Sequence, residues 1–449
     1  MTQAIPPLPQ AFAARIKAQL GTEAEAYFEA LAQPYTRGLR QNPSKPTPLA
    51  EVEGLGDPIP WEANGYYLSA ESSAGSHPLH EAGAYYLQEP SAMIPARVLS
   101  PMPGERVLDL CAAPGGKSTQ LATLLGLDGL LVCNEPIPSR AQVLSRNVER
   151  MGIGNALVVC ADPSRLESQW PCAFDAILTD APCSGEGMFR RHPETRLEWT
   201  ADSPAGCAAR QQRILESAIA MLKPGGRLVY STCTLSPEEN EQTVERLQKS
   251  HPELTPVDFS IPIGQGQMLR SRAGMLRIYP HQLRGEGHFV ALLVKQGDAS
   301  ARETSTVFSP AAVRLAPPSA TLADAYAHFA QSAASPAPNA ALGGILIDAP
   351  PLPPLHGIKV LRAGLHLGTI KGKSFAPDHA LALACPNAAA TVAITLSQAK
   401  AYQRGESLFM EDAPKGYVLL TLHGIALGFA KGSDGQLKNH YPKGLRRPW

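Results

Sequence analysis

The sequence predicts an α/β protein centred on a doubly wound parallel sheet, with an N-terminal α-rich module and a C-terminal mixed α+β portion. Two observations support this prediction. Between residues 105 and 295, short runs of β-branched and leucine residues alternate with helical segments, as a parallel sheet covered on both faces requires. The 449 residues also exceed what one ordinary core organises, so we expect two or three domains.

The chain opens with apolar residues at helical spacing. Phe12, Ile16 and Leu20 follow one another every four residues, which favours an amphipathic helix. A proline-rich stretch over residues 43–60 comes next. We therefore expect an appended N-terminal module over residues 1–95.

Six apolar runs then provide the expected strands of the sheet. They lie at residues 106–110, 129–133, 156–160, 176–179, 226–230 and 289–294. The alternation of these runs with helical segments predicts a doubly wound domain over residues 96–297.

The composition changes after the last of these runs. Residues 298–320 are rich in Ala, Ser, Thr and Pro, which is typical of a linker. Strand-like runs return at 344–347, 358–361 and 417–422. They predict a second globular portion over residues 321–449.

The charge of the whole chain does not indicate a particular partner. The 40 basic and 40 acidic residues give a net charge of zero, so any nucleic-acid binding must come from local clusters such as the basic residues between 431 and 449. No run approaches the roughly 20 apolar residues that a membrane-spanning helix needs, and the start lacks the pattern of a secretion signal. We expect a monomeric cytoplasmic protein that does not contact a membrane.

The 8 cysteines are scattered along the chain without a Cys-x-x-Cys pair, and the histidines form no cluster at ligand spacing. We therefore expect no metal site. Scattered cysteines in a chain without a secretion signal are expected to be reduced thiols, so any of them is available as a nucleophile.

The first expected strand ends in a turn that is typical of a ligand site. After Asp109 come small residues and the pair Gly115 and Gly116, and a helix is expected to begin near Lys117. Glycines let the backbone approach a ligand closely, and the amides at the start of a helix suit an anionic group. The spacing matches neither the Gly-x-Gly-x-x-Gly motif nor the phosphate-loop motif, so nicotinamide and triphosphate ligands are disfavoured.

Acidic residues follow the next two expected strands. Glu135 is placed to accept hydrogen bonds from a ribose, and Asp162 to accept one from an adenine amine. An acid at a strand end is often only a helix cap. Polar groups at three successive strand ends are therefore stronger evidence for a ligand site than either acid alone. Together with the turn, these residues predict a site for a nucleoside with a charged tail.

Two cysteines stand just past the next two strand ends, at Cys183 and Cys233. Carbon 5 of cytosine attacks a sulfonium methyl group only after a nucleophile has added at carbon 6, and a thiolate is suited to that addition. Removing the carbon 5 proton afterwards requires a second polar group beside the adduct. Asp180 is placed to hydrogen-bond nitrogen 3 and the exocyclic amine of the base.

Four segments together resemble a known family. These are 77–91, Cys111-Ala-Ala-Pro-Gly-Gly-Lys117, Asp180-Ala-Pro-Cys-Ser-Gly185 and Thr232-Cys-Thr234. They are similar, in the same order, to the motifs of the Nol/Nop/Sun (Fmu) RNA cytosine-5 methyltransferases. The resemblance implies a Rossmann-like methyltransferase sheet and S-adenosyl-L-methionine as cofactor.

The resemblance also implies roles for individual residues. Cys233 corresponds to the nucleophile and Cys183 to the residue that releases the enzyme, with Asp180 and Lys117 near the target base. The residues that it implies for cofactor binding are Ala112, Ala113, Pro114, Gly115, Gly116, Lys117, Ser118, Glu135, Asp162 and Asp180.

The C-terminal segments 427–432 and 435–444 look like the PUA-like RNA-binding portion of the RsmF-like branch of this family. The implied partner is RNA, namely small-subunit (16S) ribosomal RNA or the subunit itself. A transfer-RNA cytosine-5 methyltransferase and a non-catalytic RNA-binding scaffold stay open as alternatives. The proline- and alanine-rich residues 300–355 leave open whether the C-terminal part is one module or two.

Two other methyltransferase classes are disfavoured. A DNA cytosine-5 enzyme is expected to carry Glu-Asn-Val after its Pro-Cys motif, whereas Ser-Gly-Glu-Gly follows Cys183. An amino-methyltransferase is expected to have Asp/Asn-Pro-Pro-aromatic in place of Asp180-Ala-Pro-Cys183.

Overall fold

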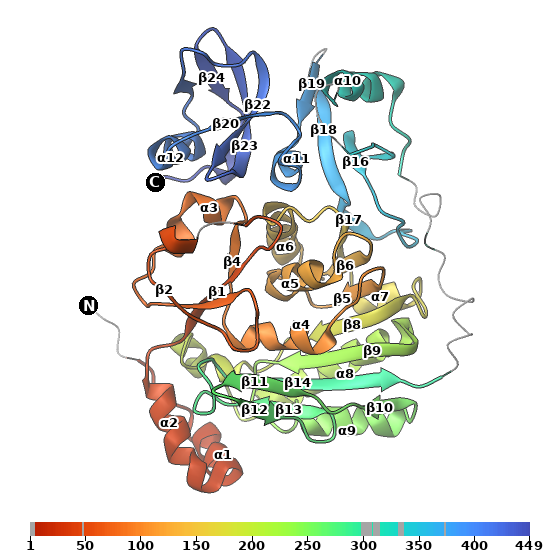
Figure 1. The fold of residues 1–449 in the computed structure, drawn as a ribbon. Helices are drawn as coiled ribbons and strands as arrows, with labels where there is room; N and C mark the ends of the chain where they lie inside the picture. Colours follow the sequence, from red (N-terminus) through yellow and green to blue (C-terminus); the bar gives the residue numbers. More distant parts are fainter. Residues whose placement is uncertain (1–4, 47–48, 298–307, 309–314, 331–335, 372–373) are drawn as a thin grey trace.

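The structure is a computed structural model that describes residues 5–46, 49–297, 308, 315–330, 336–371 and 374–449. Its centre is a nine-stranded sheet (Figure 1). In pairing order the strands are β10 (Leu254–Pro256), β14 (His288–Lys295), β9 (Leu222–Thr232), β8 (Phe174–Asp180), β5 (Arg106–Asp109), β6 (Leu130–Asn134), β7 (Ala156–Cys160) and β17 (Lys359–Ala363), and β13 (Met275–Ile278) pairs with β14.

The five strands from β9 to β7 run parallel, which confirms the doubly wound sheet. Strand β14, which contains the last predicted run at residues 289–294, pairs antiparallel with β9 beside the five parallel strands. At the opposite edge β17 pairs antiparallel with β7. The apolar run at 358–361 predicts a strand there, but not that this strand extends the central sheet.

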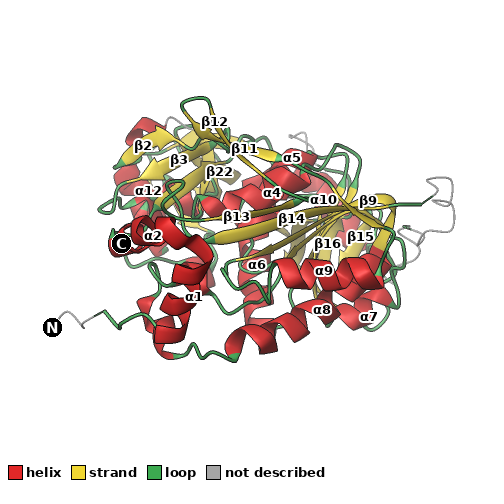
Figure 2. Ribbon diagram, turned by 90° about the horizontal axis from the view of Figure 1, so that it is seen from below, coloured by secondary structure: helices red, strands yellow, loops and turns green. Residues whose placement is uncertain are grey.

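Helices cover both faces of this sheet. On one face lie α4 (Ile94–Leu99), α5 (Gly116–Leu125) and α6 (Pro138–Arg150), and on the other α7 (Pro163–Glu167), α8 (Ser203–Met221) and α9 (Glu241–Ser250) (Figure 2). Neighbouring strand residues point to opposite faces: Leu108 packs with α8 and α9, whereas Val107 packs with α4 and α5. Burial on both faces explains why these strands have nearly continuous apolar sequences.

The N-terminal segment forms two helices and a small antiparallel sheet. The expected helical pattern appears as α1 (Gln10–Leu20) and α2 (Ala24–Ala32). The sheet, whose order is β2-β3-β1-β4, was not predicted from the sequence. Its elements are β1 (Arg37–Gln41), β2 (Leu55–Pro58), β3 (Gly65–Leu68) and β4 (Tyr85–Leu87), with α3 (Pro78–Glu81) between β3 and β4. A separate hairpin of β11 (Ser260–Gly264) and β12 (Gln267–Arg270) lies later in the chain.

The C-terminal part contains two further sheets. The first, in the order β15-β16-β18-β19, consists of β15 (Ala340–Leu342), β16 (Ile345–Asp348), β18 (Leu365–Lys371) and β19 (Ser374–Pro377), with α10 (Ala320–Ala330) and α11 (His379–Ala384). The second, in the order β20-β22-β23-β24-β21, consists of β20 (Ala390–Ala393), β21 (Leu408–Phe409), β22 (Gly416–Leu422), β23 (Ile425–Ser433) and β24 (Gln436–Asn439), with α12 (Leu396–Arg404). Most of the expected linker, residues 298–307 and 309–314, lies outside the described residues.

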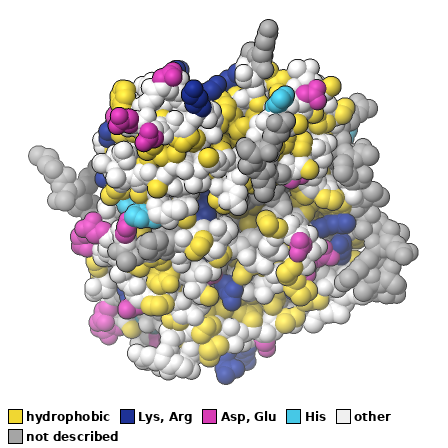
Figure 3. Space-filling view, turned by 45° about the horizontal axis from the view of Figure 1, so that its top comes forward, with side chains coloured by type: hydrophobic (Ala, Val, Ile, Leu, Met, Phe, Trp, Pro, Cys, Tyr) yellow, Lys and Arg dark blue, Asp and Glu magenta, His cyan; other side chains and the backbone are white. Residues whose placement is uncertain are grey.

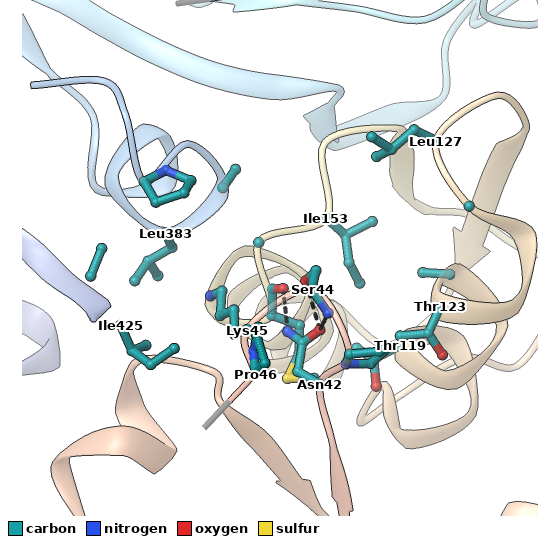
Figure 4. Close-up of a pocket in the computed structure, with 18 of the residues that line it drawn as sticks. Asn42, Ser44, Lys45, Pro46, Thr119, Thr123, Leu127, Ile153, Leu383 and Ile425 are labelled. Atoms are coloured by element: carbon teal, nitrogen blue, oxygen red, sulfur yellow. Dashed lines mark hydrogen bonds between the residues drawn. The ribbon is translucent and has the colours of Figure 1, made fainter. Parts of the chain in front are cut away.

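The N-terminal segment, helix α5 and the C-terminal sheets meet around a cavity of about 440 Å³ (Figure 4). Asn42 and Ser44 face into it, held together by a hydrogen bond of 2.7 Å from Ser44 Oγ to Asn42 Oδ1. Thr123 of α5 and Ile425 of β23 line it from other sides. Among the described residues around this cavity, none belongs to the site residues predicted from the sequence.

Charged side chains of both signs are interspersed on the face shown in Figure 3, in keeping with the net charge of zero. Within the described part of the chain, no helix is both long and apolar enough to span a membrane.

We expect Trp170→Ala to destabilise the central domain strongly. The Trp170 side chain is fully buried, packs edge-on against Phe174 with ring centroids 5.9 Å apart, and donates from Nε1 to the carbonyl of Pro354 at 2.7 Å. Removing a buried indole costs about 3 to 5 kcal/mol. Chemical denaturation followed by fluorescence measures the loss. The control Phe409→Ala changes a ring that is 80% exposed, and an equally small effect of both variants would contradict the prediction.

Candidate functional site

The site lies at the carboxyl edge of the parallel strands. Because these strands share one direction, the residues that follow β5, β6, β7, β8 and β9 meet at the same edge of the sheet. The predicted site residues fall into two neighbouring groups there. One group lies in and around the turn between β5 and α5, which we call the cofactor turn, and beside a cavity. The other group surrounds the two cysteines.

The turn after β5 has the tight backbone that its glycines predict. Gly115 has φ +111°, a left-handed conformation that disfavours other residues, and α5 begins at the next residue. A Cβ on Gly116 would approach the ring of Tyr86 to 3.3 Å. The Ala113–Pro114 peptide bond is cis.

Side chains from neighbouring elements hold this turn in place. Arg140 donates to the carbonyl of Ala113 at 3.0 Å, and Asn147 donates to that of Pro114 at 2.8 Å, so α6 fixes the turn from one side. Ser118 Oγ donates to Asp109 Oδ2 at 2.6 Å. Ala112 is buried at the start of the turn, where its amide donates to the carbonyl of Asn134 at 2.8 Å.

A cavity of about 450 Å³ opens beside the turn. Cys111, Glu135 and Asp162 line it, together with Pro182 from the loop after β8. The structure thus brings three successive strand ends to one cavity. The other predicted cofactor residues are adjacent in the chain or packed behind the turn, but they do not line this cavity.

The two acids of the cavity are held differently. Glu135 is 1% exposed, accepts a hydrogen bond from the Ile137 amide at 3.0 Å and forms an ion pair with Arg140 at 3.3 Å. Asp162 caps α7, because its Oδ1 accepts from the amide and the hydroxyl of Ser164 at 3.0 and 2.6 Å. Asp162 therefore serves as a helix cap and also lines the cavity.

Asp180 joins the cofactor turn to the cysteine group. Lys117 Nζ donates to Asp180 Oδ2 at 2.8 Å, and Ser231 Oγ donates to Oδ1 at 2.7 Å. His288 Nε2 lies 3.9 Å from Oδ1. Burial opposes ionisation, but the charge of Lys117, with the hydrogen bonds from Lys117 and Ser231, outweighs it and lowers the pKa of Asp180. The carboxylate is therefore ionised at neutral pH.

Lys117 and His288, the ionisable neighbours of Asp180, also have shifted pKa values. Burial would lower the pKa of Lys117, but Asp180, and to a smaller extent a thiolate at Cys233, raise it, so the ammonium keeps its charge. Burial lowers the pKa of His288 to about 3, with a further contribution from Lys117. His288 is therefore a neutral imidazole.

The two predicted cysteines lie in contact, with Cys183 Sγ 3.3 Å from Cys233 Sγ. The hydrogen bond to Cys233, followed by burial, raises the pKa of Cys183 well above its ordinary value. Cys183 is therefore a protonated thiol at neutral pH. Among the described residues, no group of three or more His, Cys, Asp or Glu is placed to hold a metal ion.

A buried acid that was not predicted from the sequence organises the cysteine loops. Glu239 accepts from the Ser184 amide at 3.0 Å, from the Ser184 hydroxyl, and from Gln211 Nε2 at 2.9 Å. Ser184 Oγ also lies 2.8 Å from Thr234 Oγ1, which connects the two loops directly. The three glutamates of residues 237–241, close behind Cys233 in the chain, are the only local signal for this acid.

Ser231 and His288 were also missed, for different reasons. Ser231 directly precedes the Thr-Cys motif, so it was detectable as the residue that points to the opposite side of β9 from Thr232. His288 reaches the site because β14 pairs antiparallel with β9 and places Phe289 opposite Thr232. No local pattern in the sequence predicts that register.

The buried Asp109 makes the stability of the protein depend on pH. Burial raises its pKa to about 7, against the hydrogen bond from Ser118. A pKa raised in the folded state contributes stability at low pH that is lost as pH rises from about 4 to about 7. We expect Asp109→Asn to remove a slope of at most about 1.4 kcal/mol per pH unit within this window.

Thermal melting of both proteins between pH 4 and 8 measures this effect. The control is Asp128→Asn, which replaces an exposed acid. Parallel pH profiles for the native protein and Asp109→Asn would contradict a raised pKa at Asp109.

The chain matches four family models. Residues 8–90 match the N-terminal domain of 16S rRNA methyltransferase RsmF, and residues 96–294 match 16S rRNA methyltransferase RsmB/F. Residues 337–385 match the first C-terminal domain of RsmF rRNA methyltransferase, and residues 389–447 match the methyltransferase RsmF PUA domain.

Relatives match over nearly the whole chain. Ribosomal RNA small subunit methyltransferase F of Enterobacter sp. (strain 638) is 32% identical over 94% of this chain and 92% of its own length. The protein of the same name from Klebsiella pneumoniae (strain 342) is 31% identical over 98% of this chain and 96% of its own. The crystal structure of a methyltransferase homolog from Pyrococcus horikoshii is 31% identical, covers 64% of this chain and 95% of its own, and superposes with a TM-score of 0.55.

These matches confirm the resemblance and the Rossmann-like methyltransferase fold that the sequence motifs predicted. The chain belongs to the 16S rRNA methyltransferase RsmB/F family.

Proposed function

We propose that this RNA methyltransferase uses S-adenosyl-L-methionine to methylate carbon 5 of a cytosine in 16S ribosomal RNA, through a transient bond between Cys233 and carbon 6 of the base. The observation that carries the proposal is the contact of two thiols, 3.3 Å apart, beside an ionised carboxylate. A methyltransferase that acts on a ring or exocyclic nitrogen has no need for two such thiols.

The cavity beside the cofactor turn fits an adenosyl group with a charged tail. Glu135 and Asp162 line this cavity, and we assign Glu135 to the ribose hydroxyls and Asp162 to the adenine amine. Asp109 Oδ1 is buried without a side-chain partner behind the turn. When bound, S-adenosyl-L-methionine supplies an electrophilic methyl group.

Cys233 performs the first covalent step. Its thiolate adds to carbon 6 of the cytosine, the electron pair of the 5,6 double bond shifts towards nitrogen 3, and carbon 5 becomes part of an enamine. Lys117 provides a positive charge close enough to the Cys233 sulfur to interact with the thiolate.

Asp180 recognises the base as charge develops on it. Its carboxylate is placed to accept from the exocyclic amine and to favour a proton on nitrogen 3, which stabilises the adduct. Lys117 and Ser231 hold the two carboxylate oxygens, so the orientation of this acceptor is fixed before the base arrives.

Cys183 acts in release. Once carbon 5 carries the methyl group, its remaining proton must leave, and the electron pair of that C–H bond re-forms the double bond as the Cys233–carbon 6 bond breaks. The raised pKa of Cys183 gives a thiol that holds its proton in the free enzyme and whose thiolate is a strong base. In release its own proton passes to the Cys233 sulfur, 3.3 Å away, as that sulfur leaves carbon 6, and we assign the Cys183 thiolate so formed to the removal of the carbon 5 proton, directly or through one water molecule.

The family relatives are named for ribosomal RNA of the small subunit, which favours 16S ribosomal RNA over transfer RNA. The two intact thiols, Asp180 and the cofactor acids favour an enzyme over a non-catalytic scaffold. Calorimetry with S-adenosyl-L-methionine separates these alternatives, since a scaffold has no need to bind it. Cytoplasmic location, a monomeric state and metal-free chemistry stay predictions.

We expect Cys183→Ala to accumulate a covalent protein–RNA adduct. Attack by Cys233 is intact in this variant, but release is slowed by the loss of the base, by about 10²- to 10⁴-fold. A denaturing gel with labelled 16S ribosomal RNA and S-adenosyl-L-methionine should show a slowly migrating band. The band should vanish in the double variant Cys183→Ala/Cys233→Ser, and a band that persists there would reassign the nucleophile.

We expect Cys233→Ser to lose essentially all methyl transfer, because a serine hydroxyl is a far weaker nucleophile at neutral pH than a thiolate. Transfer of labelled methyl groups to RNA measures the loss. Cys385→Ser, in the C-terminal part, is the matched control and should keep full activity. Undiminished turnover by Cys233→Ser would refute the covalent mechanism.

A further inference from the structure

A cleft rich in arginine lies between the central domain and the last residues of the chain. We call it the arginine cleft; its volume is about 270 Å³, and α3, α6, α11 and the segment 444–447 form its walls. In Figure 1 the chain ends beside α12, above α3. The charged residues that matter for its chemistry are Arg146, Arg150, Arg446, Arg447, Glu81 and Glu149.

Both acids of the cleft are already paired. Glu81 Oε1 accepts from Arg447 at 2.7 Å, which ties the end of the chain to α3. Glu149 forms an ion pair with Arg362 of β17. The negative charges that line the cleft are therefore balanced by Arg447 and Arg362.

Three cations lack such a partner. The side chains of Arg146 and Arg446 are exposed and, among the described residues, form no hydrogen bond or ion pair. Arg150 directs its donors to the carbonyls of His80 and Tyr85, at 2.6 and 3.2 Å, and to Asn147. The cleft therefore has a positive excess, although the chain as a whole is neutral.

The Arg446 side chain lies against the end of α12. Its guanidinium rests against Gly405, the residue that ends α12, where φ is +101°. A Cβ at this glycine would lie 2.4 Å from the guanidinium carbon, so a larger residue would displace the side chain.

Helix α6 connects the arginine cleft to the cofactor cavity. Arg140, in its first turn, lines the cofactor cavity, and Arg146 and Arg150 line the cleft. Positions 140, 143, 146, 147 and 150 fall on one face of the helix. At 1.5 Å per residue, Arg140 and Arg150 are about 15 Å apart along the axis, a distance that two or three nucleotides span.

We propose that the arginine cleft binds backbone phosphates of the substrate RNA and that the RNA follows the exposed face of α6 from the cleft to the active site. Guanidinium groups match phosphate oxygens in a two-pronged geometry, and phosphate contacts position a nucleic acid without reading its sequence. This inference rests on the proposed function and adds the route that its substrate takes.

The double variant Arg146→Ala/Arg446→Ala tests the proposal. Its matched control is Arg97→Ala/Lys249→Ala, which removes the same charge from exposed positions on α4 and α9. Fluorescence anisotropy with a labelled 16S ribosomal RNA transcript measures the affinity between about 50 and about 300 mM salt. Affinity that comes from phosphate contacts falls steeply as the salt concentration rises.

We expect the cleft variant to bind RNA about tenfold more weakly and the slope of log affinity against log salt to fall by about 2, one for each cation removed. S-adenosyl-L-methionine affinity and melting temperature should stay unchanged, which shows that the fold is intact. Unchanged RNA affinity, or an equal loss in the control variant, would overturn the proposal. So would displacement of the RNA by polyglutamate as readily as by oligouridylate, since that indicates a site for acidic peptide.

The same proteins separate this inference from the proposed function. If the cleft variant loses RNA affinity but Cys183→Ala never yields the covalent adduct, the cleft stands and the cytosine chemistry falls. If the adduct forms with Cys183→Ala, and still forms at the same RNA concentration when Arg146→Ala/Arg446→Ala is added to that variant, the chemistry stands and the cleft falls.

Discussion

The ion pair between Lys117 and Asp180 is the contact on which the arrangement of the site depends. Lys117 is in the first turn of α5, directly after the cofactor turn, and Asp180 is the last residue of β8, directly before the loop of Cys183. Their contact at 2.8 Å therefore sets the distance between the turn after β5 and the cysteine loops. Ser231 adds β9 through a hydrogen bond to the same carboxylate, and the His288 ring of β14 lies 3.9 Å from it. Because the pair is largely removed from water, its charges interact more strongly than surface charges do, although neither partner can be removed without leaving the other uncompensated.

The N-terminal helices are part of this site rather than an appendage to it. Glu186, just beyond the Cys183 loop, is fully buried and paired with Arg15 of α1, and it also accepts from the Leu235 amide at 3.2 Å. One carboxylate thus joins α1, the loop after β8 and the loop after β9. Nearby, Arg190 forms an ion pair with Glu286 at 2.7 Å and donates to the last turn of α2. The module that the sequence predicts as separate over residues 1–95 therefore supports the loops that carry both thiols.

The sequence predicted those parts of the structure that depend on local patterns. The parallel strands were predictable because burial on both faces requires continuous apolar runs, and Asp180 and Cys233 were predictable because they end such runs. The sheet β1 to β4 was not predicted, since its short strands carry arginine, glycine and tyrosine rather than an alternating pattern. Nor was the place of β17 in the central sheet, because pairing with β7 joins residues about 200 positions apart. The position of His288 likewise depends on an antiparallel register that no neighbouring residue encodes.

Two aspartates of the site, Asp109 and Asp180, show how the surroundings shift the pKa of one kind of group in opposite directions. Asp109 is enclosed behind the cofactor turn with a hydroxyl as its partner, and burial, followed at a distance by the charge of Asp180, raises its pKa to about 7. Asp180 is half-buried, and the adjacent ammonium of Lys117 lowers its pKa. At this end of β5 and β8 the protein thereby keeps negative charge mainly on Asp180, the residue beside the thiols. On the proposed mechanism this difference favours the Lys117–Asp180 pair, because a second ionised carboxylate nearby would compete with Asp180 for the charge of Lys117.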